Sequence, residues 1–170
     1  LFIIILALSL MGILSPVIYA GLSMYQQQRI ITLFDPNADP LGTGWNIAQS
    51  KTAIGSGGFF GKGYLSGTQS QLDFIPESHS DFIFAVIAEE LGLLGMSLLF
   101  LAYAIIIYRI FFIAFRSETI FGRLASASIG FIFLIFILIN VSMVVGIIPV
   151  VGVPLPLVSQ GGTSLATHLL

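Results

Sequence analysis

Long apolar stretches divide this chain into segments that are typical of membrane-spanning helices. Three of them, residues 1–23, 81–108 and 124–148, are long enough to cross a bilayer, whose hydrocarbon core needs about 20 helical residues. A further apolar stretch starts within residues 163–170. We expect each to be a helix, because backbone polar groups in lipid must be paired within their own segment. The pattern predicts an all-α integral membrane protein, a polytopic helical bundle with about three full spans and the start of a fourth.

The composition agrees with this prediction and excludes other classes. The chain is 56% hydrophobic and 8% charged, whereas a soluble domain has about a quarter charged residues. Six Lys and Arg residues and a net charge of -2 cannot form a basic face for nucleic acid. Cysteine is absent, which excludes disulfides and thiolate metal sites. No charged segment or cleavage site precedes the first stretch, so we expect a span, not a signal peptide, in an internal piece of a larger membrane protein.

Charge predicts the orientation. Residues 109–123 hold three arginines against a single acid, Glu118, whereas residues 24–80 spread three cations among four acids. The positive-inside rule therefore places residues 109–123 in the cytoplasm. Residues 24–80 and 149–162 then share the outer face.

The long segment 24–80 is expected to be structured. Trp45 to Ile54 predict a short helix at the membrane interface, ended by the glycine-rich residues 55–58. The glycines between Gly42 and Gly67 indicate tight turns or close backbone approach. Aromatic residues in the same segment argue against disorder.

Asp81 lies where this polar segment meets the second apolar stretch. A carboxylate there faces water and lipid phosphates together, which suits a catalytic base for a lipid-linked substrate. The alternative is a helix cap, since the helix dipole favours an acid in the first turn by about 0.3–1 kcal/mol, with Ser78 or Ser80 as N-cap. His79 has a similar alternative, as a polar residue at the interface.

Two further acids lie inside the second span. Glu89 and Glu90 are about 12 Å below Asp81 along a helix, where ionisable residues are costly and face protein or a wet cavity. Glu89 is expected nearer the Asp81 face and Glu90 towards another helix. The alternative is that each is neutral, or paired with a span outside this chain.

Other candidates are weaker. The stretch around Lys62 is similar to a phosphate-binding loop, but Ser56 and Gly63 break the motif, so Lys62 either binds an anion or is a solvated charge. Asn140 is expected to hydrogen-bond between helices.

Residues 149–158 are apolar but contain three prolines, which exclude a regular helix. We expect a re-entrant or interfacial segment shielded by protein. Residues 159–164 follow as Ser-Gln-Gly-Gly-Thr-Ser. Such a stretch opens a helix with free N–H groups that suit an anion, or forms an ordinary cap.

Taken together, several stretches resemble the SEDS family, which includes RodA and FtsW. They are residues 45–51, 53–58, 61–63, 67–71, 74–85 (with Pro76-Glu77-Ser78-His79-Ser80-Asp81), 89–92, 151–156 and 159–164. The match covers essentially the whole chain and is most like RodA. Ser80 stands where Thr is usual, and Gln160 replaces a common Tyr.

The resemblance implies a C-terminal fragment of a multi-pass protein of the bacterial cytoplasmic (inner) membrane. The family polymerises lipid II into peptidoglycan glycan strands for cell elongation and rod shape, and its essential aspartate corresponds to Asp81. The hypothesis is that Asp81 is the general base on the outer face. The expected substrate contacts are Glu77, His79, Lys51, Lys62, Glu89, Ser159, Gly161 and Gly162.

The resemblance also implies partners. These are lipid II, undecaprenyl pyrophosphate lipids and a class B penicillin-binding protein. No cofactor is assigned with certainty, although a divalent cation, Mg or Mn, is a candidate for the pyrophosphate. Two alternatives stay open: a lipid-linked precursor flippase or transporter, which Glu89, Glu90 and the broken segment would suit, and a non-catalytic cell-wall scaffold.

Overall fold

The computed structural model describes residues 20–35, 39, 42–68 and 80–159. Most of the predicted span 1–23, and all of residues 163–170, lie outside this part. The helices are α2 (Met24–Phe34), α3 (Thr43–Gly57), α5 (Ile83–Arg116) and α6 (Ile120–Val145). No strand occurs among the described residues, so the prediction of an all-helical protein is confirmed for them.

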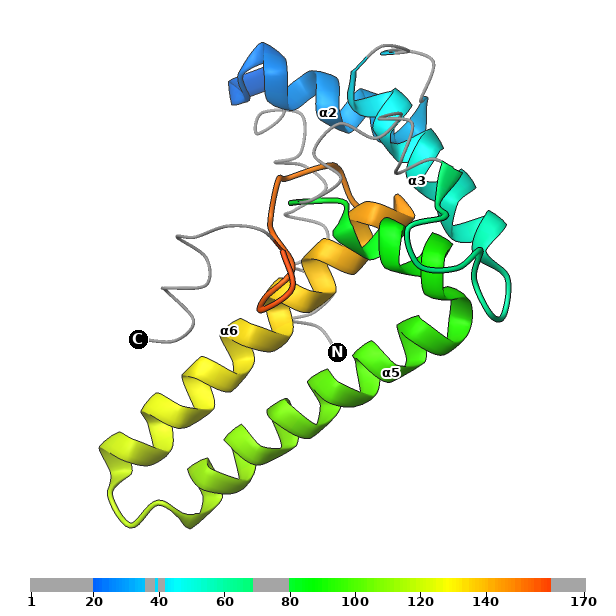
Figure 1. Cartoon of the computed structure of the whole chain (residues 1–170). Helices are drawn as coiled ribbons and strands as arrows, with labels where there is room; N and C mark the ends of the chain where they lie inside the picture. The colour runs from blue at the N-terminus through cyan, green and yellow to red at the C-terminus, as the bar shows by residue number, and fades with distance from the viewer. Residues whose placement is uncertain (1–19, 36–38, 40–41, 69–79, 160–170) are drawn as a thin grey trace, which may run out of the picture.

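Helices α5 and α6 form an antiparallel hairpin that dominates the molecule (Figure 1). Both are long and apolar enough to cross a membrane, and only residues 117–119 connect them. The Thr119 hydroxyl caps α6 by accepting from the Gly122 N–H at 3.1 Å. Both helices extend beyond the predicted spans at this end, so where the membrane boundary lies on them stays a prediction.

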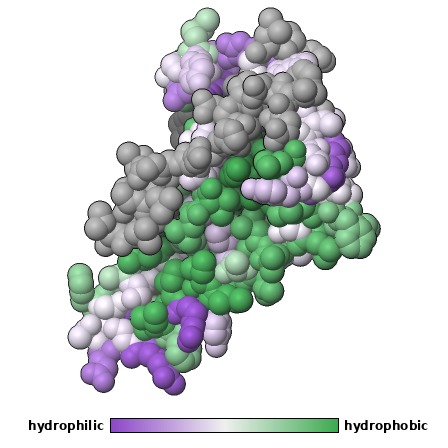
Figure 2. All heavy atoms as spheres, viewed as in Figure 1, coloured by the Kyte–Doolittle hydropathy of each residue, from purple (hydrophilic) through white to green (hydrophobic). Residues whose placement is uncertain are grey.

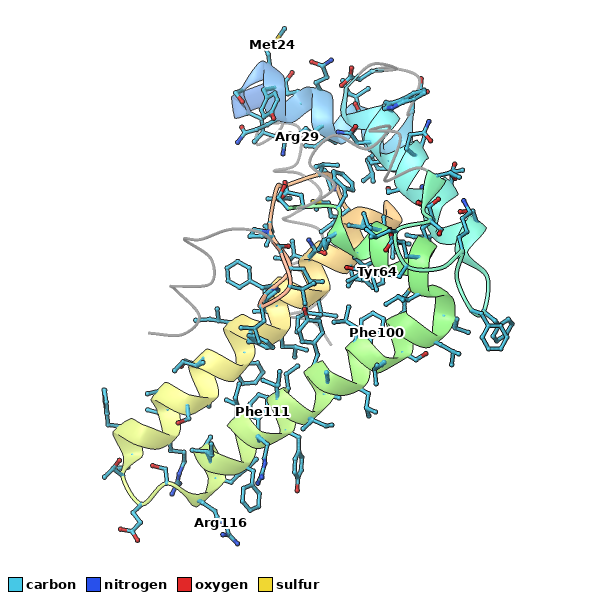
Figure 3. The ribbon with its side chains drawn as sticks, in the orientation of Figure 1. Met24, Arg29, Tyr64, Phe100, Phe111 and Arg116 are labelled. Carbon is cyan, nitrogen blue, oxygen red and sulfur yellow. The ribbon has the colours of Figure 1, made fainter. Side chains whose placement is uncertain are left out.

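Aromatic contacts hold the hairpin together, while much of its outer surface is apolar and exposed. The Phe111 side chain lies between the two helices (Figure 3) and meets the Phe131 ring edge-on at 5.2 Å. Tyr103 packs against Phe133 in the same way. A broad apolar surface follows both helices, and polar groups gather at the end with the connecting turn (Figure 2). Such a surface suits contact with lipid or with further spans.

Helix α5 is broken at Gly92, whose φ of 64° and ψ of -157° are not helical. In a continuous helix, the carbonyls of residues 89 and 90 would accept from the N–H groups of residues 93 and 94. Here both the two carbonyls and the two N–H groups bond to the loop after α3 instead. Lys62 N donates to Glu89 O and Gly63 N to Glu90 O, each at 3.0 Å. Leu93 N and Leu94 N donate to the carbonyls of residues 58 and 59, at 2.9 and 3.2 Å. The loop therefore satisfies the backbone groups that the break releases.

Glycine is required at this contact because the two backbones touch. A Cβ atom at Gly57 would lie 1.9 Å from Ala88 O, and one at Gly61 would lie 2.0 Å from Glu90 O. At Gly92 it would lie 2.3 Å from Gly61 N. The close backbone approach predicted for the glycines between Gly42 and Gly67 is confirmed at Gly57 and Gly61; the part of Gly92 was not predicted.

A buried carboxylate reinforces the same contact. Glu89 is fully buried, and its Oε1 accepts from Lys62 Nζ at 2.7 Å and from the Thr68 N–H and hydroxyl at 2.8 and 3.1 Å. A buried charge is tolerated when it is paired and hydrogen-bonded. Within this chain Glu89 is thus paired with the loop after α3, whereas the partner considered from the sequence lay only in a span outside the chain.

The remaining elements differ from the sequence prediction in detail. Helix α2 was missed, because residues 24–80 were treated as loop up to Trp45; its signal is the capping box formed by Ser23 and Gln26. Helix α3 is longer than the predicted 45–54. The N-cap of α5 is Phe82, so the prediction of Ser78 or Ser80 was wrong.

The segment after α6 is irregular, as its prolines predict. Gly146 ends the helix with a left-handed φ of 76°, and residues 147–159 contain no regular element. They fold back over α5, where the Tyr103 hydroxyl donates to Pro156 O at 2.7 Å.

Gly92→Ala is expected to lower the stability of the protein in detergent by about 2–4 kcal/mol, because alanine cannot adopt this backbone conformation without strain and would also clash with the loop. Thermal unfolding measures the change. Gly55→Ala is the matched control, since among the described residues nothing outside the backbone of its own helix lies within 4 Å of its Cβ position and alanine is favoured in a helix. An equal, small effect of both substitutions would contradict the proposed contact.

Lys62→Met is expected to destabilise the protein by about 2 kcal/mol, because it leaves the Glu89 carboxylate buried without its cation. The double variant Lys62→Met/Glu89→Gln should recover part of this loss. A double-mutant cycle of unfolding measurements checks it, with an expected coupling of at least about 1 kcal/mol. Strictly additive effects would show that the pair does not stabilise the loop.

Candidate functional site

Asp81 lies in the turn that leads into α5, directly before the N-cap Phe82. Its side chain is half-buried. The Oδ2 atom lies 3.3 Å from the position that a Cβ atom would take at Gly152. The carboxylate therefore sits against the segment that follows α6, at a residue without a side chain. Gly152 also has a φ of 78°, a conformation that favours glycine.

Asn140 holds the backbone of Asp81. Its side chain is completely buried in α6. The amide Nδ2 donates to Asp81 O at 2.9 Å and to Val153 O at 2.7 Å. One side chain thus joins α6, the start of α5 and the proline-rich segment. The sequence predicted a hydrogen bond between helices here, but nothing in the pattern indicated that the partner is the Asp81 backbone.

Ser159 fixes the residue before Asp81. Its buried hydroxyl donates to Ser80 O at 2.6 Å and accepts from the Leu155 N–H at 2.7 Å. The consecutive carbonyls of Ser80 and Asp81 are therefore both hydrogen-bonded, the first by Ser159 and the second by Asn140. Ser159 was predicted to contact substrate, and the structure brings it to the Asp81 turn through this backbone contact.

The predicted cations and Glu89 lie elsewhere. Lys51 reaches the C-terminal end of α6, where its Nζ lies 2.8 Å from the Cβ position of Gly146; a cation is favoured at a helix C-terminus. Lys62 and Glu89 pair with each other at the break in α5. Glu77, His79, Gly161 and Gly162 lie outside the described residues. The roles predicted for all these residues stay predictions.

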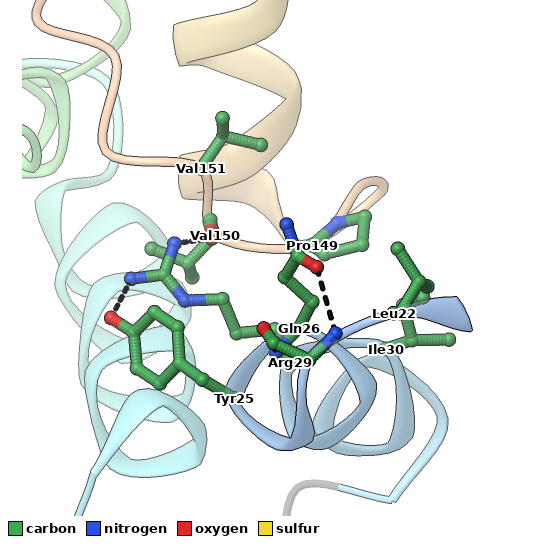
Figure 4. A pocket seen from close by; sticks show the side chains of 9 residues that line it. Leu22, Tyr25, Gln26, Arg29, Ile30, Pro149, Val150 and Val151 are labelled. Atoms are coloured by element: carbon green, nitrogen blue, oxygen red, sulfur yellow. Dashed lines mark hydrogen bonds between the residues drawn. The ribbon is translucent and has the colours of Figure 1, made fainter. Parts of the chain in front are cut away.

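Sequence reasoning missed one further residue, Arg29 of α2. It lines a pocket of about 390 Å³ between α2 and residues 149–151 (Figure 4). Its guanidinium donates to Val150 O and to the Tyr25 hydroxyl. The only sequence signal was a lone cation shortly after the first apolar stretch.

Metal ligands do not gather in the part of the chain that the structure describes. No group of three or more His, Cys, Asp or Glu side chains there could hold a metal ion. The divalent cation therefore stays a prediction without named ligands.

Comparison with known proteins identifies relatives over most of the chain. The model of a family described as cell cycle protein, named for FtsW, RodA and SpoVE, matches residues 1–170. The chain is 57% identical over 141 residues to the peptidoglycan glycosyltransferase MrdB of Escherichia coli strain K12, covering 83% of this chain and 38% of MrdB. It is 41% identical over 149 residues to the peptidoglycan glycosyltransferase RodA of Treponema pallidum strain Nichols, covering 88% and 34%.

More distant relatives extend the comparison. Stage V sporulation protein E of Bacillus subtilis strain 168 is 38% identical over 146 residues, covering 86% of this chain and 40% of that protein. A solved structure described as "Structural coordination of polymerization and crosslinking by a peptidoglycan synthase complex" matches with a TM-score of 0.75 and 29% identity, over 98% of this chain and 45% of that one. The chain spans about two fifths of the length of the curated relatives it matches.

The family match over the whole chain agrees with the all-helical fold and with the motifs around Asp81. This chain therefore belongs to the FtsW, RodA and SpoVE family, which is the SEDS family that those motifs resemble.

Proposed function

We propose that this chain is part of a peptidoglycan glycosyltransferase that polymerises lipid II, with Asp81 as its general base. The observation that supports the proposal most directly is that Asn140 and Ser159 hydrogen-bond to the backbone carbonyls of Asp81 and Ser80. A general base must be held within hydrogen-bond reach of the proton it removes. The names of the relatives, peptidoglycan glycosyltransferases MrdB and RodA, give the reaction class.

In the proposed step, the Asp81 carboxylate takes the proton from the 4-hydroxyl of the acceptor sugar. The hydroxyl oxygen attacks the anomeric carbon of the growing chain and forms the new glycosidic bond. The bond to undecaprenyl pyrophosphate breaks on the opposite side, and the pyrophosphate leaves with the electron pair. This displacement inverts the anomeric carbon and needs one base and a stabilised leaving group.

The geometry around Asp81 favours this role over that of a simple cap. The N-cap of α5 is Phe82, which follows Asp81. The carboxylate Oδ2 lies against Gly152, where the absence of a side chain keeps space next to it. Because the backbone carbonyls of residues 80 and 81 both accept hydrogen bonds from buried side chains, the backbone that carries the carboxylate is held in place.

The pyrophosphate charge requires cations or N–H donors. Lys51, Lys62 and residues 159–164, which include Gly161 and Gly162, are the proposed donors. Lys62 is part-exposed but paired with Glu89, so it would contact substrate only by sharing that partner. Glu77 and His79 precede Asp81 in the chain and are proposed to position it or the sugar.

The location follows from the same arrangement. Asp81 precedes the N-cap of α5, and Arg116 is the last residue of that helix (Figure 3). Arg123 lies in the first turn of α6, which follows directly. With the arginines in the cytoplasm of a bacterium, Asp81 faces the outer side of the inner membrane.

We further propose elongation and rod shape as the cellular role, and a class B penicillin-binding protein as partner. The identity to MrdB and RodA supports the first. For the second, the similar solved structure is described as a peptidoglycan synthase complex with polymerisation and crosslinking.

Asp81→Asn in the whole protein, assayed with its partner, is expected to reduce polymerisation of labelled lipid II by a factor of about 100 or more, because a carboxamide cannot accept the proton. Folding and complex formation should be unchanged. The length distribution of the glycan product measures the effect. Normal polymer from Asp81→Asn would remove the base assignment, and no polymer from the unaltered protein would favour a flippase or a scaffold.

Asn140→Ala is expected to lower kcat about tenfold with little change in KM, because the lost hydrogen bonds position Asp81 and do not bind substrate. Ser128→Ala is the matched control on the same helix, since within the described residues that hydroxyl bonds to the Leu124 carbonyl of α6. Equal rates for both variants, after correction for any difference in thermal stability, would contradict a positioning role for Asn140.

A further inference from the structure

The pocket between α2 and residues 149–151 combines an apolar lining with one cation. Leu22, Ile30, Pro149, Val150 and Val151 provide the apolar part, and Ser23, Tyr25, Gln26 and Arg29 provide the polar part. Its volume is about 390 Å³, which is within the range of small-molecule sites. Figure 4 shows Arg29 and Gln26 side by side on one wall, facing the irregular segment.

The Arg29 side chain is held in place by two hydrogen bonds, which occupy only some of its N–H donors. Its guanidinium lies over the Tyr25 ring at 4.3 Å and donates to the Tyr25 hydroxyl and to Val150 O. A guanidinium has five N–H donors, so these two bonds leave others. The Nε atom is buried and has no partner among the described residues. A buried donor without a partner is costly, which favours a ligand or water that supplies an acceptor.

No carboxylate neutralises this cation within the described part of the chain, where the ion pair observed is that of Lys62 with Glu89. Gln26 adds to the donor side. Its Oε1 accepts from Ser23 N at 3.1 Å, so its amide N–H groups are directed away from that bond. The pocket thus offers a positive charge and several donors, and among the described residues no anion pairs with them.

The chemistry of the lining selects the anion. Arginine is suited to phosphate because its planar fork matches two phosphate oxygens. A free phosphate ion would gain nothing from the apolar residues, whereas a phosphate ester with a hydrocarbon chain would bury that chain against them. Leu22 lines this apolar part and ends the first span predicted from the sequence, so the apolar part is expected to face the membrane.

We infer that Arg29 and this pocket bind the phosphate group of a membrane lipid, separately from the Asp81 turn. The two sites share one segment, since Val150 accepts from Arg29 and Gly152 lies against the Asp81 carboxylate. The pocket therefore holds a lipid phosphate beside the proposed base. The inference rests on the proposed function only for which lipid is present, because binding itself requires no polymerisation.

The test is direct binding to the whole protein in detergent, by calorimetry, with farnesyl phosphate, farnesol and inorganic phosphate as probes. Farnesyl phosphate should bind at least about tenfold more tightly than either of the others, because each lacks one half of the ligand. Arg29→Gln should weaken farnesyl phosphate binding by about tenfold to a hundredfold. Arg123→Gln, an exposed arginine at the other end of α6, should leave it unchanged.

Arg29→Lys separates charge from geometry and guards against a folding defect in the first variant. It should bind farnesyl phosphate with intermediate affinity, because lysine keeps the charge without the planar fork. Equal affinity of all variants would overturn the site, and equal binding of inorganic phosphate would overturn the lipid assignment. Loss of binding in Arg29→Gln supports the site even if Asp81→Asn proves active. Failure of the proposed function can therefore be distinguished from failure of the lipid site.

Discussion

The break in α5 leaves four backbone groups without their usual helical partners: the carbonyls of Glu89 and Glu90 and the N–H groups of Leu93 and Leu94. All four form hydrogen bonds with the loop after α3 instead. An apolar helix cannot leave such groups unpaired, since each would cost several kcal/mol in lipid. The insertion of this loop therefore permits the bend at Gly92 and joins α3 to the first turns of α5. Because Asp81 directly precedes those turns, its position relative to the part of α5 after Gly92 depends on this contact.

The buried Glu89 pairs with the loop after α3 in this structure. Acids at such depth mark sites of ion or substrate movement in many membrane proteins. Here the carboxylate receives Lys62 and Thr68 from the inserted loop. The pair connects side chains at the place where the backbones already meet, so charge and backbone pairing stabilise the same junction.

The Asp81 turn is a second junction, built from side chains that bond to backbone. Asn140 and Ser159 use their polar groups on carbonyls of the turn and of the segment after α6. Backbone held in this way is pre-organised, as the proposed general base would require. The same segment forms one wall of the Arg29 pocket, so the Asp81 turn and the pocket both pack against residues 149–153.

The sequence by itself determined the membrane class, the two long spans, a helix near Trp45, the irregular proline-rich segment and the motif that contains Asp81. These follow from local properties: apolar length, proline and glycine positions, and short motifs. Only the tertiary structure decided the break at Gly92 and two side-chain contacts. Lys62 and Glu89 are 27 positions apart in the sequence, and Asn140 and Asp81 are 59 positions apart. Such contacts depend on which segments pack together, and apolar periodicity does not encode that choice. A helix pattern is continuous through residue 92, and a loop from elsewhere in the chain makes the interruption favourable.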